Sequence, residues 1–419
     1  MPDIKTIWIF NHYASSDFDD KGGRHYCLAK YLKRFGYEPT VFCCNIIHNT
    51  DRVCIESDSI ANKYMDGAID VPFVFIKGRA YKGNGKTRFL NMLDFYRNLK
   101  KAAVDQAVQD GLPDIIYASS VHPLTLVAGI QLAKRFSRKC VSEVRDLWPE
   151  SIVEYSDHLN RSNPIIRLLY AGEKWIYKKS DAIIFTFKGG YDYLMERGWT
   201  KAIPESKVFH VNNGVDLEVF DHNRETYTIN DEDLDNEHII KIVYTGSIRK
   251  VNNLGRLLDI AKLVSDPNVR FLVWGDGDEL DDLKGRLERE QITNVKFKGR
   301  VDKKFVPYIT SRATVNFAHN NPSALFRFGI SFNKIFDYLA AGRPVLVSFG
   351  SKYNPVVEGS AAILPESFSD ADIARAIDSI GIMEKEEYRE LCINARNTAK
   401  EYSYETLARN LAEILNIFR

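Results

Sequence analysis

The stretch Gly329–Leu346, GISFNKIFDYLAAGRPVL, predicts a helix that leads directly into a buried strand. Ser331 is the expected N-cap of this helix, and Gly342 with Pro344 is expected to end it. Helical spacing gives the helix one core face, formed by Phe332, Ile335, Phe336 and Leu339. A helix that precedes a short apolar run is typical of a parallel α/β sheet.

Three polar residues lie on the opposite face of the same predicted helix, beside the positive end of its dipole. These residues are Asn333, Lys334 and Asp337. They form either a solvated surface with one Lys–Asp pair or a ligand site, and the stretch by itself leaves both interpretations open.

Short apolar runs alternate with helical patterns along the rest of the chain. The strands predicted in the first half are 4–11, 39–44, 114–118, 139–144, 182–186 and 208–211. Those predicted in the second half are 239–245, 269–274, 295–297, 314–317, 345–347 and 361–364. This pattern occurs twice, so we expect an α/β protein with two doubly wound, Rossmann-like domains.

A domain boundary is expected near the turn signal that begins at Asn212. Predicted helices fall on both sides of it, at 24–36, 122–136, 163–179, 188–197, 252–264, 278–290, 303–311, 331–341 and 384–417. The acidic stretch 221–237, with seven acidic residues and one arginine, is expected to be a solvated connector or surface insertion. We therefore expect one domain over 1–212, joined by a C-terminal helix at 403–419, and a second over 213–402.

Composition excludes several classes of protein. The 419 residues are 45% hydrophobic and carry a net charge of +1, which argues against a nucleic-acid binder. No apolar run approaches the ~18 residues that cross a bilayer, and the N-terminus predicts a strand, not a signal peptide. The six cysteines show no metal-ligand spacing, so we expect idle thiols in a reducing cytosol.

Glycine-bearing loops follow several predicted strands, where open parallel sheets bind ligands. The first-half candidates, Gly22 and Gly23, directly precede a helix. Those of the second half are Gly246, Ser247, Arg249, Lys250, Gly275, Asp276, Gly277, Arg300 and Val301. Fixed cations in such loops would suit a diphosphate. Each loop is also consistent with ordinary turn chemistry, but their joint placement favours a ligand site.

Metal and hydrolase chemistry are not indicated. Two Asp-x-Asp patterns, 17–19 and 276–278, match the pattern that holds a divalent cation on a diphosphate, but 56 acidic residues make chance matches expected. The sequence contains no HExxH, no Gly-x-Ser-x-Gly elbow and no Walker loop. We therefore expect no metal site.

Several short motifs are spread over nearly the whole chain: GGRH at 22–25, VHPLT at 121–125, EVRDLWPES at 143–151, NNGVD at 212–216, YTGSI at 244–248, GDG at 275–277 and the opening stretch. In these motifs the chain resembles the family-four retaining glycosyltransferases of GT-B fold, whose two Rossmann-like domains face a cleft. It is similar in particular to the bacterial branch that builds surface polysaccharides, with colanic-acid and O-antigen transferases.

The resemblance implies a nucleotide-sugar donor, UDP-linked in expectation, as co-substrate and no separate cofactor. The second domain would bind it, with the base and ribose near Arg300, Val301 and Asp337. The diphosphate would meet Arg249 or Lys250, Lys334 and the amides near Gly23. The sugar would lie against residues 329–334, which include Asn333. Transfer with retention would rest on cations and helix N-termini at the leaving group.

This sequence also departs from the family pattern. Many relatives carry two glutamates eight positions apart, where this chain has Gly329 and Asp337. Many also have a histidine where Arg145 precedes Asp146. We expect Arg145 and Asp146 to face the acceptor or the sugar, with His122 as a substitute for the missing histidine or as a helix cap.

The expected acceptor is a glycan or a polyprenyl-diphosphate-linked glycan. The basic-aromatic stretches 77–101 and 161–179 could contact an anionic membrane, or they could be ordinary amphipathic helices. We expect a cytoplasmic protein, peripheral on the inner face of the plasma membrane. Two alternatives remain: a sugar-nucleotide epimerase of the same fold and a non-catalytic nucleotide-sugar or glycan-binding protein.

Overall fold

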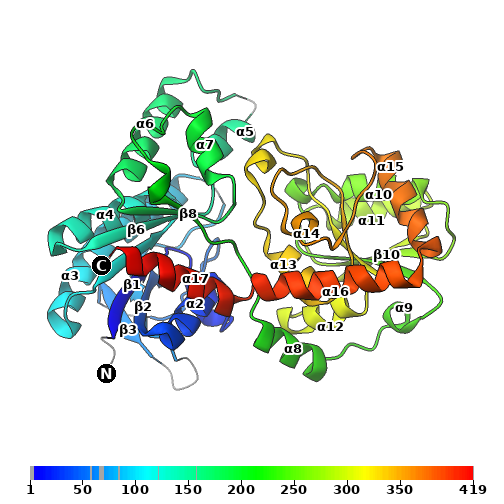
Figure 1. Cartoon of the computed structure of the whole chain (residues 1–419), viewed down its shortest axis with the longest axis horizontal. Coiled ribbons are helices and arrows are strands. Elements are labelled where there is room, and N and C mark those ends of the chain that lie inside the picture. Colours follow the sequence, from blue (N-terminus) through cyan, green and yellow to red (C-terminus); the bar gives the residue numbers. More distant parts are fainter. Residues whose placement is uncertain are drawn as a thin grey trace. The chain divides into compact units, whose positions relative to one another are not determined.

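A computed structural model of the chain divides into two compact units. Unit 1 consists of Met1–Asn212 with Tyr404–Arg419, and unit 2 consists of Asn213–Ser403. Each unit is an α/β layer structure with helices on both faces of a sheet (Figure 1). The structure describes residues 4–56, 59–65, 70–83, 85–120, 122–156 and 158–418.

Unit 1 is built on an eight-stranded sheet with the order β3-β4-β2-β1-β5-β6-β7-β8. Its strands are β1 (Lys5–Phe10), β2 (Tyr37–Cys44), β3 (Ala61–Tyr64), β4 (Phe73–Ile76), β5 (Ile115–Ser119), β6 (Lys139–Val144), β7 (Ala182–Phe185) and β8 (Val208–His210). All neighbouring pairs are parallel except β3 with β4. The sequence patterns did not predict β3 and β4.

Helices cover the two faces of this sheet. They are α1 (Ser15–Asp19), α2 (Arg24–Leu32), α3 (Lys86–Asp110), α4 (Pro123–Phe136), α5 (Glu150–Glu154), α6 (Pro164–Lys179), α7 (Gly190–Glu196) and α17 (Tyr404–Ile417). The final helix, α17, packs against α2, and both bury side chains in the core that includes Ile7 and Ile9 of β1. Because side chains alternate along a strand, Trp8 faces the other side, where its ring contacts Phe136 of α4. There α4 packs between α3 and α6.

Unit 2 contains a parallel sheet with the order β11-β10-β9-β12-β13-β14. Its strands are β9 (Ile240–Thr245), β10 (Val269–Trp274), β11 (Val295–Gly299), β12 (Val315–Ala318), β13 (Val345–Val347) and β14 (Ala362–Ile363). The expected class, α/β with two doubly wound Rossmann-like domains, is therefore confirmed. Parallel strands bring their carboxyl ends to one edge, so the loops after β9, β10 and β11 are neighbours.

Helices cover both faces of the sheet of unit 2 (Figure 1). They are α8 (Leu217–Thr226), α9 (Glu232–Asp235), α10 (Leu254–Leu263), α11 (Leu280–Arg289), α12 (Val306–Ser311), α13 (Asn333–Ala340), α14 (Pro355–Glu358), α15 (Asp370–Asp378) and α16 (Lys385–Glu401). On one face of the sheet, side chains of α10 and α15 are buried against β9 and β10. Helix α12 contacts α8 and α13. Among the described residues, no helix is long and apolar enough to cross a membrane.

The acidic stretch 221–237 is a partly helical surface segment of unit 2 and not the solvated connector that was one of its two expected forms. It contains the end of α8 and the short helix α9, which Asp231 caps by accepting from the backbone N–H of Asp233 and Leu234. Its acidic side chains are paired with cations of the sheet and of later helices, as in Asp231–Lys298, Asp233–Lys296, Asp235–Arg312 and Asp221–Arg396. Leu234 of the same stretch is fully buried in the hydrophobic cluster with Val243 and Leu272, so apolar burial and these ion pairs together attach the stretch to unit 2.

Candidate active site

Helix α13, from the stretch that predicted the fold, lies beside the carboxyl end of β9. The Tyr338 hydroxyl accepts a hydrogen bond from the backbone N–H of Thr245 at 2.9 Å. One turn earlier, Lys334 Nζ lies 3.1 Å from the Tyr244 hydroxyl and 4.4 Å from the centre of its ring. Residues four apart share a helix face, so the two contacts fix the first turn of α13 at the edge of the sheet.

The start of this helix differs from the prediction. The helix begins at Asn333 after Phe332, which provides no side-chain cap. Ser331 is not the N-cap, because its hydroxyl accepts from the backbone N–H of Asn213 at 3.1 Å. The predicted end is confirmed, since Gly342 adopts a left-handed φ of 63°.

Lys334 and Asp337 are half-buried charged groups. Burial lowers the pKa of Lys334 to about 8. Burial also raises the pKa of Asp337 to about 6, although Lys303 acts in the opposite direction. Within the described part of the chain, neither side chain has an ion-pair partner. Perturbed, unpaired groups at a sheet edge are typical of a ligand site, which favours that interpretation over a solvated Lys–Asp pair.

The glycines of the neighbouring loops are required by packing between the loops. A Cβ on Gly275 would lie 1.8 Å from the carbonyl oxygen of Gly246, and a Cβ on Gly277 would lie 2.0 Å from that of Ile248. Backbone hydrogen bonds join the same loops, from Gly246 to Trp274 and from Ile248 to Asp276. These contacts explain both glycines without any ligand.

Replacing Gly277 by alanine is therefore expected to destabilise unit 2 by about 1–3 kcal/mol, because the new methyl group meets backbone that cannot move freely. The matched control is Gly255→Ala in α10, where the added Cβ meets nothing closer than 3.5 Å. That change is expected to be neutral or slightly stabilising. The midpoint of urea-induced unfolding measures both variants, and equal midpoints would contradict the packing explanation.

The other polar residues at the carboxyl edge of the unit 2 sheet are of two kinds, those with hydrogen-bond partners and those without one among the described residues. Ser247 is held by Asn252, whose side-chain amide donates to the Ser247 carbonyl at 2.7 Å and hydroxyl at 2.9 Å. Asp276 accepts from the N–H of Gly277, which is turn chemistry. By contrast, four exposed polar side chains have no hydrogen-bond or ion-pair partner within the described residues: Arg249, Lys250, Arg300 and Asn333. Val301 belongs to the hydrophobic cluster below the edge.

Metal binding has no support at this edge. No group of three or more potential His, Cys, Asp or Glu ligands occurs among the residues that the structure describes. In unit 1, the other Asp-x-Asp pattern is divided between two roles, because Asp19 pairs with Arg52 while Asp17 contacts helix α2.

In unit 1, Asp17 occupies the N-terminus of α2. Its carboxylate accepts from the backbone N–H of His25 at 2.9 Å. Gly23 adopts a φ of 83°, and a Cβ there would lie 2.2 Å from the Asp17 carboxylate, whereas Gly22 donates its N–H to the Asp17 carbonyl. The glycine at position 23 is thus explained by a carboxylate of the chain itself, whereas nothing packed against Gly22 requires a glycine there, and phosphate binding at these amides stays a prediction.

A buried ion pair beside α2 was not predicted. Arg24 is 3% exposed and Glu143 is fully buried; Arg24 Nε lies 2.7 Å from Glu143 Oε2. Arg24 also donates to the carbonyl oxygens of Val211 and Asn212, where the chain leaves unit 1. Burial acts to raise the pKa of Glu143, but Arg24 and His25 outweigh it and hold the pKa well below its usual value. The only sequence signal is a charge within each of two otherwise buried elements.

The predicted acceptor-side residues lie after β5 and β6. The backbone N–H of Arg145 donates to the Ser120 hydroxyl at 3.0 Å. The side chains of Arg145 and Asp146 have no ion-pair partner within the described residues. His122 occupies the N-cap position of α4, but its side chain makes no capping hydrogen bond, and Val121 of the same motif lies outside the described residues.

His122 is instead part of a buried histidine pair. Its Nε2 lies 2.6 Å from Nδ1 of His12, whose ring stacks on Phe95 with centroids 4.3 Å apart. Burial lowers the pKa of His122 to about 3, with Arg88 adding to the effect. The imidazole is therefore neutral near pH 7, and its buried Nδ1 has no hydrogen-bond partner in the described structure.

Comparisons with known proteins agree with this architecture. Residues 25–219 match the family model described as Glycosyltransferase Family 4, and residues 240–380 match Glycosyl transferases group 1. The chain is therefore a glycosyltransferase of GT-B fold. The first half of the chain is similar to Family 4 domains and the second half to group 1 domains, and neither match alone spans half of the chain. A comparison with curated proteins finds no match.

Several solved structures share the fold over almost the whole chain. A sucrose-phosphate synthase from Thermosynechococcus elongatus is 17% identical with a TM-score of 0.70, covering 99% of this chain and 98% of its own. Anabaena Alr3699/HepE in complex with UDP-glucose is 15% identical with a TM-score of 0.62, covering 99% and 100%. An E. coli trehalose-6-phosphate structure bound with UDP-2-fluoro glucose is 11% identical with a TM-score of 0.70, covering 98% of both chains.

Proposed function

We propose that this glycosyltransferase moves a sugar, with retention of configuration, from a UDP-linked donor to a glycan or polyprenyl-diphosphate-linked acceptor. The proposed setting is synthesis of a bacterial surface polysaccharide. One observation carries the donor side of the proposal: Lys334 and Asp337 are half-buried charges without an ion-pair partner among the described residues, in the first turns of α13 beside the end of β9. The UDP-glucose and UDP-2-fluoro glucose complexes of proteins with this fold support the choice of nucleotide.

The proposed roles follow from the charge of each group. Lys334, with Arg249 or Lys250, would neutralise the diphosphate as the bond to the sugar breaks. Preorganised cations at a leaving group stabilise the charge that develops in the transition state. Asp337 would accept hydrogen bonds from the ribose hydroxyls, with Arg300 at the base. Because these cations would stabilise the diphosphate as it leaves, the proposed transfer needs no protein nucleophile.

Gly329 is the position where contact with the donor sugar is expected to differ from that in relatives. Its φ of 107° lies in a region that L side chains rarely adopt. A glutamate could not replace this glycine without a change of backbone. We propose that backbone groups and Asn333, not a carboxylate at position 329, contact the sugar.

Asp337→Ala is expected to raise the KM for the donor about tenfold or more, because the ribose loses its acceptor. The variant should leave stability unchanged or slightly higher, since burial already disfavours the charged carboxylate. Steady-state kinetics with varied donor and the unfolding midpoint separate these effects. A fall in stability with an unchanged donor KM would contradict the assignment.

Donor affinity is expected to fall as the pH rises above about 8. The pKa of Lys334, lowered by burial to about 8, keeps the ammonium largely protonated at pH 7 and lets it lose its proton above pH 8. A neutral amine attracts a diphosphate less, by up to about tenfold per pH unit. Calorimetric titration of UDP at pH 7, 8 and 9 measures the slope. In Lys334→Arg the slope should disappear, because guanidinium stays protonated; a wild-type affinity that is flat to pH 9.5 would contradict the role of Lys334.

The acceptor side is assigned to unit 1. Arg145 and Asp146, which follow β6 and have no ion-pair partner within the described part of the chain, would contact the acceptor, and His122 would act as a neutral imidazole. A neutral imidazole can accept or donate a hydrogen bond at the ring nitrogen that His12 leaves free, but a pKa of about 3 makes it a poor base near pH 7. Orientation of an acceptor hydroxyl through a hydrogen bond is the proposed role of this group.

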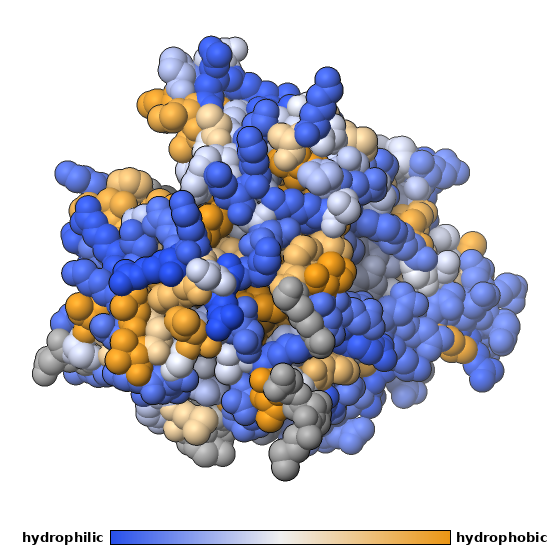
Figure 2. Space-filling model, turned by 60° about the vertical axis from the view of Figure 1, so that its left-hand side comes forward, coloured by the Kyte–Doolittle hydropathy of each residue, from blue (hydrophilic) through white to orange (hydrophobic). Residues whose placement is uncertain are grey.

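We also propose that unit 1 rests peripherally on the anionic inner face of the plasma membrane. The stretch 77–101 presents Phe89, Lys77 and Lys86 to solvent. In Figure 2, which brings the left-hand side of Figure 1 forward, hydrophobic patches alternate with hydrophilic side chains. Two of the cations are paired with acids, Arg79 with Asp94 and Lys82 with Asp51, so these two charges are partly neutralised before any contact with a membrane.

A panel of UDP-, GDP- and dTDP-sugars tests the proposal against its alternatives. Slow release of nucleotide from one donor, accelerated by a lipid-linked glycan, is the expected result. Interconversion of two free sugar nucleotides would instead favour an epimerase. Binding without any release or transfer would favour a non-catalytic binding protein, and no binding of any nucleotide-sugar would contradict all three.

A further inference from the structure

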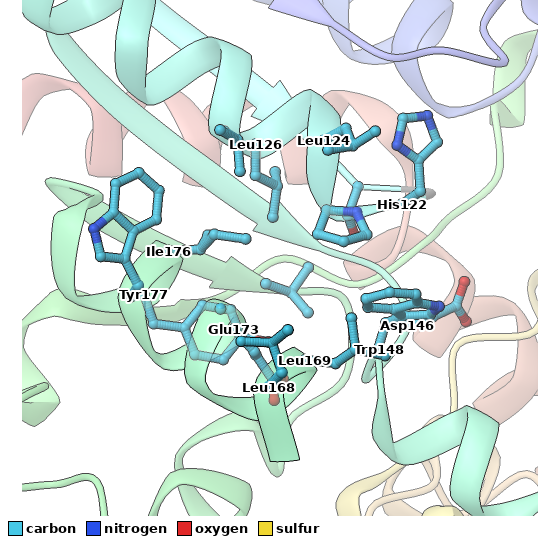
Figure 3. Close-up of a pocket in the computed structure, with 16 residues that line it drawn as sticks. His122, Leu124, Leu126, Asp146, Trp148, Leu168, Leu169, Glu173, Ile176 and Tyr177 are labelled. Carbon is cyan, nitrogen blue, oxygen red and sulfur yellow. The ribbon is translucent and has the colours of Figure 1, made fainter. Parts of the chain in front are cut away.

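Unit 1 contains an apolar pocket of about 210 Å³ between α4, α6 and the end of β6. In Figure 3, Leu124 and Leu126 of α4 lie across the pocket from Leu168, Leu169 and Ile176 of α6. Protein interiors contain few voids larger than a water molecule, and an apolar cavity of ~150 Å³ is large enough to bind benzene. The pocket is therefore large enough for part of a hydrocarbon ligand.

One end of the pocket is polar and adjoins the proposed acceptor residues. Ser120, His122 and Asp146 line this end, where Figure 3 shows the Trp148 indole beside Asp146. The buried Nδ1 of His122 has no partner within the described structure. Arg145 precedes Asp146 and also has no ion-pair partner among the described residues. A ligand in the pocket would thus end beside two hydrogen-bonding groups, Ser120 and His122, and the Asp146 carboxylate; the neighbouring cation, Arg145, does not itself line the pocket.

The outer wall of the pocket is an exposed apolar part of α6. Leu168 is 71% exposed and Trp175 is 41% exposed, although both line the pocket. The same helix carries exposed cations, Arg167 and Lys178 among them. An apolar rim with neighbouring positive charge is complementary to a hydrocarbon chain that carries an anionic group.

The inner wall carries one acidic residue, Glu173. It accepts hydrogen bonds from the hydroxyls of Tyr177 at 2.8 Å and Tyr193 at 2.7 Å. Burial raises the pKa of Glu173 to about 8. The carboxyl group is therefore largely neutral at pH 7, so it does not oppose the binding of an apolar chain.

We propose that this pocket binds the hydrocarbon chain of the acceptor, a prenyl chain attached to a phosphate, and that the phosphate lies at the polar end near Arg145. The inference rests on the proposed function, in which unit 1 binds the acceptor. It adds that the lipid part of the acceptor is recognised directly by the enzyme, apart from any contact between the protein and a membrane.

Gly172 allows the pocket to be filled without disturbing the fold. It lines the pocket on α6, and an added Cβ would meet no atom within 4 Å. Gly172→Phe should therefore place a ring in the pocket. Ala171→Phe is the matched control, because Ala171 is exposed on the same helix and does not line the pocket. Leu168→Asp provides a second test at an exposed position, where folding is expected to tolerate the change.

Quenching of tryptophan fluorescence by farnesyl phosphate measures binding, since Trp148 and Trp175 line the pocket. Wild type and Ala171→Phe are expected to bind alike, whereas Gly172→Phe and Leu168→Asp should bind at least about tenfold more weakly. Equal binding by all four proteins would overturn the proposal. Inorganic phosphate or octyl glucoside competing as well as farnesyl phosphate would also overturn it, because chain and phosphate would not both be recognised.

Binding of the donor distinguishes this inference from the proposed function. UDP-glucose titrated into the same variants should bind as it does to wild type, since the pocket belongs to unit 1 and the donor residues to unit 2. If the variants weaken the binding of farnesyl phosphate but no nucleotide-sugar binds at all, the lipid site in unit 1 is supported and the proposed donor site in unit 2 is contradicted.

Discussion

Lys334→Met is expected to lower kcat about a hundredfold or more, with little effect on folding. Loss of one charge-stabilising donor in a preorganised site typically costs ~10²–10³ in kcat. Lys334 lies 3.1 Å from the Tyr244 hydroxyl and is the half-buried cation at the start of α13. Methionine has a similar length and avoids the burial of a charge, so the unfolding midpoint should not fall.

The control for this variant is Lys385→Met. Lys385 is exposed at the start of α16 in the same unit and has no ion-pair partner within the described residues. Its kcat and donor KM should equal those of wild type. If Lys334→Met keeps more than about half of the wild-type kcat at saturating donor and acceptor, Lys334 does not stabilise the leaving group.

Arg24→Met is expected to destabilise unit 1 by about 3–5 kcal/mol, because it leaves the fully buried Glu143 carboxylate without its cation. The change also removes the donors to the carbonyl oxygens of Val211 and Asn212. Urea-induced unfolding, followed by tryptophan fluorescence, measures the loss. The matched control is Arg52→Met, which breaks an exposed pair with Asp19 and should cost less than about 1 kcal/mol.

A double-mutant cycle tests the physical cause. If the cost arises from an uncompensated buried charge, Arg24→Met combined with Glu143→Met should be less destabilising than the sum of the single changes. Similar losses in Arg24→Met and Arg52→Met, or full additivity in the cycle, would contradict the importance of the buried pair.

The sheet framework could be predicted because its strands are local apolar runs. The predicted strands at 139–144, 269–274 and 345–347 coincide with β6, β10 and β13. The missed strand β3, with the sequence ANKY, is polar, half-exposed and antiparallel at the edge, so it carries no apolar pattern. Its neighbour β4 is apolar but only four residues long.

The prediction of a solvated connector at 221–237 was wrong for a different reason. Composition alone suggested solvated chain, because seven acidic residues have few apolar neighbours. The stretch is attached to unit 2 by Leu234, which is buried in a hydrophobic cluster, and by pairs of Asp231 and Asp233 with Lys296 and Lys298, more than 60 residues later. Pairing over such a distance has no signature in one sequence.

The candidate site also contains features that the sequence could predict and features that it could not. The spacing within one helix was enough to single out Lys334 and Asp337. The reason why positions 275 and 277 require glycine could not be predicted, because both residues pack against the backbone of another loop. The pairs Arg24–Glu143 and His12–His122 join residues more than 100 positions apart, so only the fold brings them together.

Calorimetric titration of UDP-glucose into wild type, Lys334→Met and Asp337→Ala tests the central claim most directly, because it measures the donor site without an acceptor. Saturable binding by wild type at micromolar to millimolar concentrations is predicted, weakened at least about tenfold by each substitution. Equal binding by all three proteins, or no binding of UDP-, GDP- or dTDP-sugars by wild type, would contradict a nucleotide-sugar site at the start of α13.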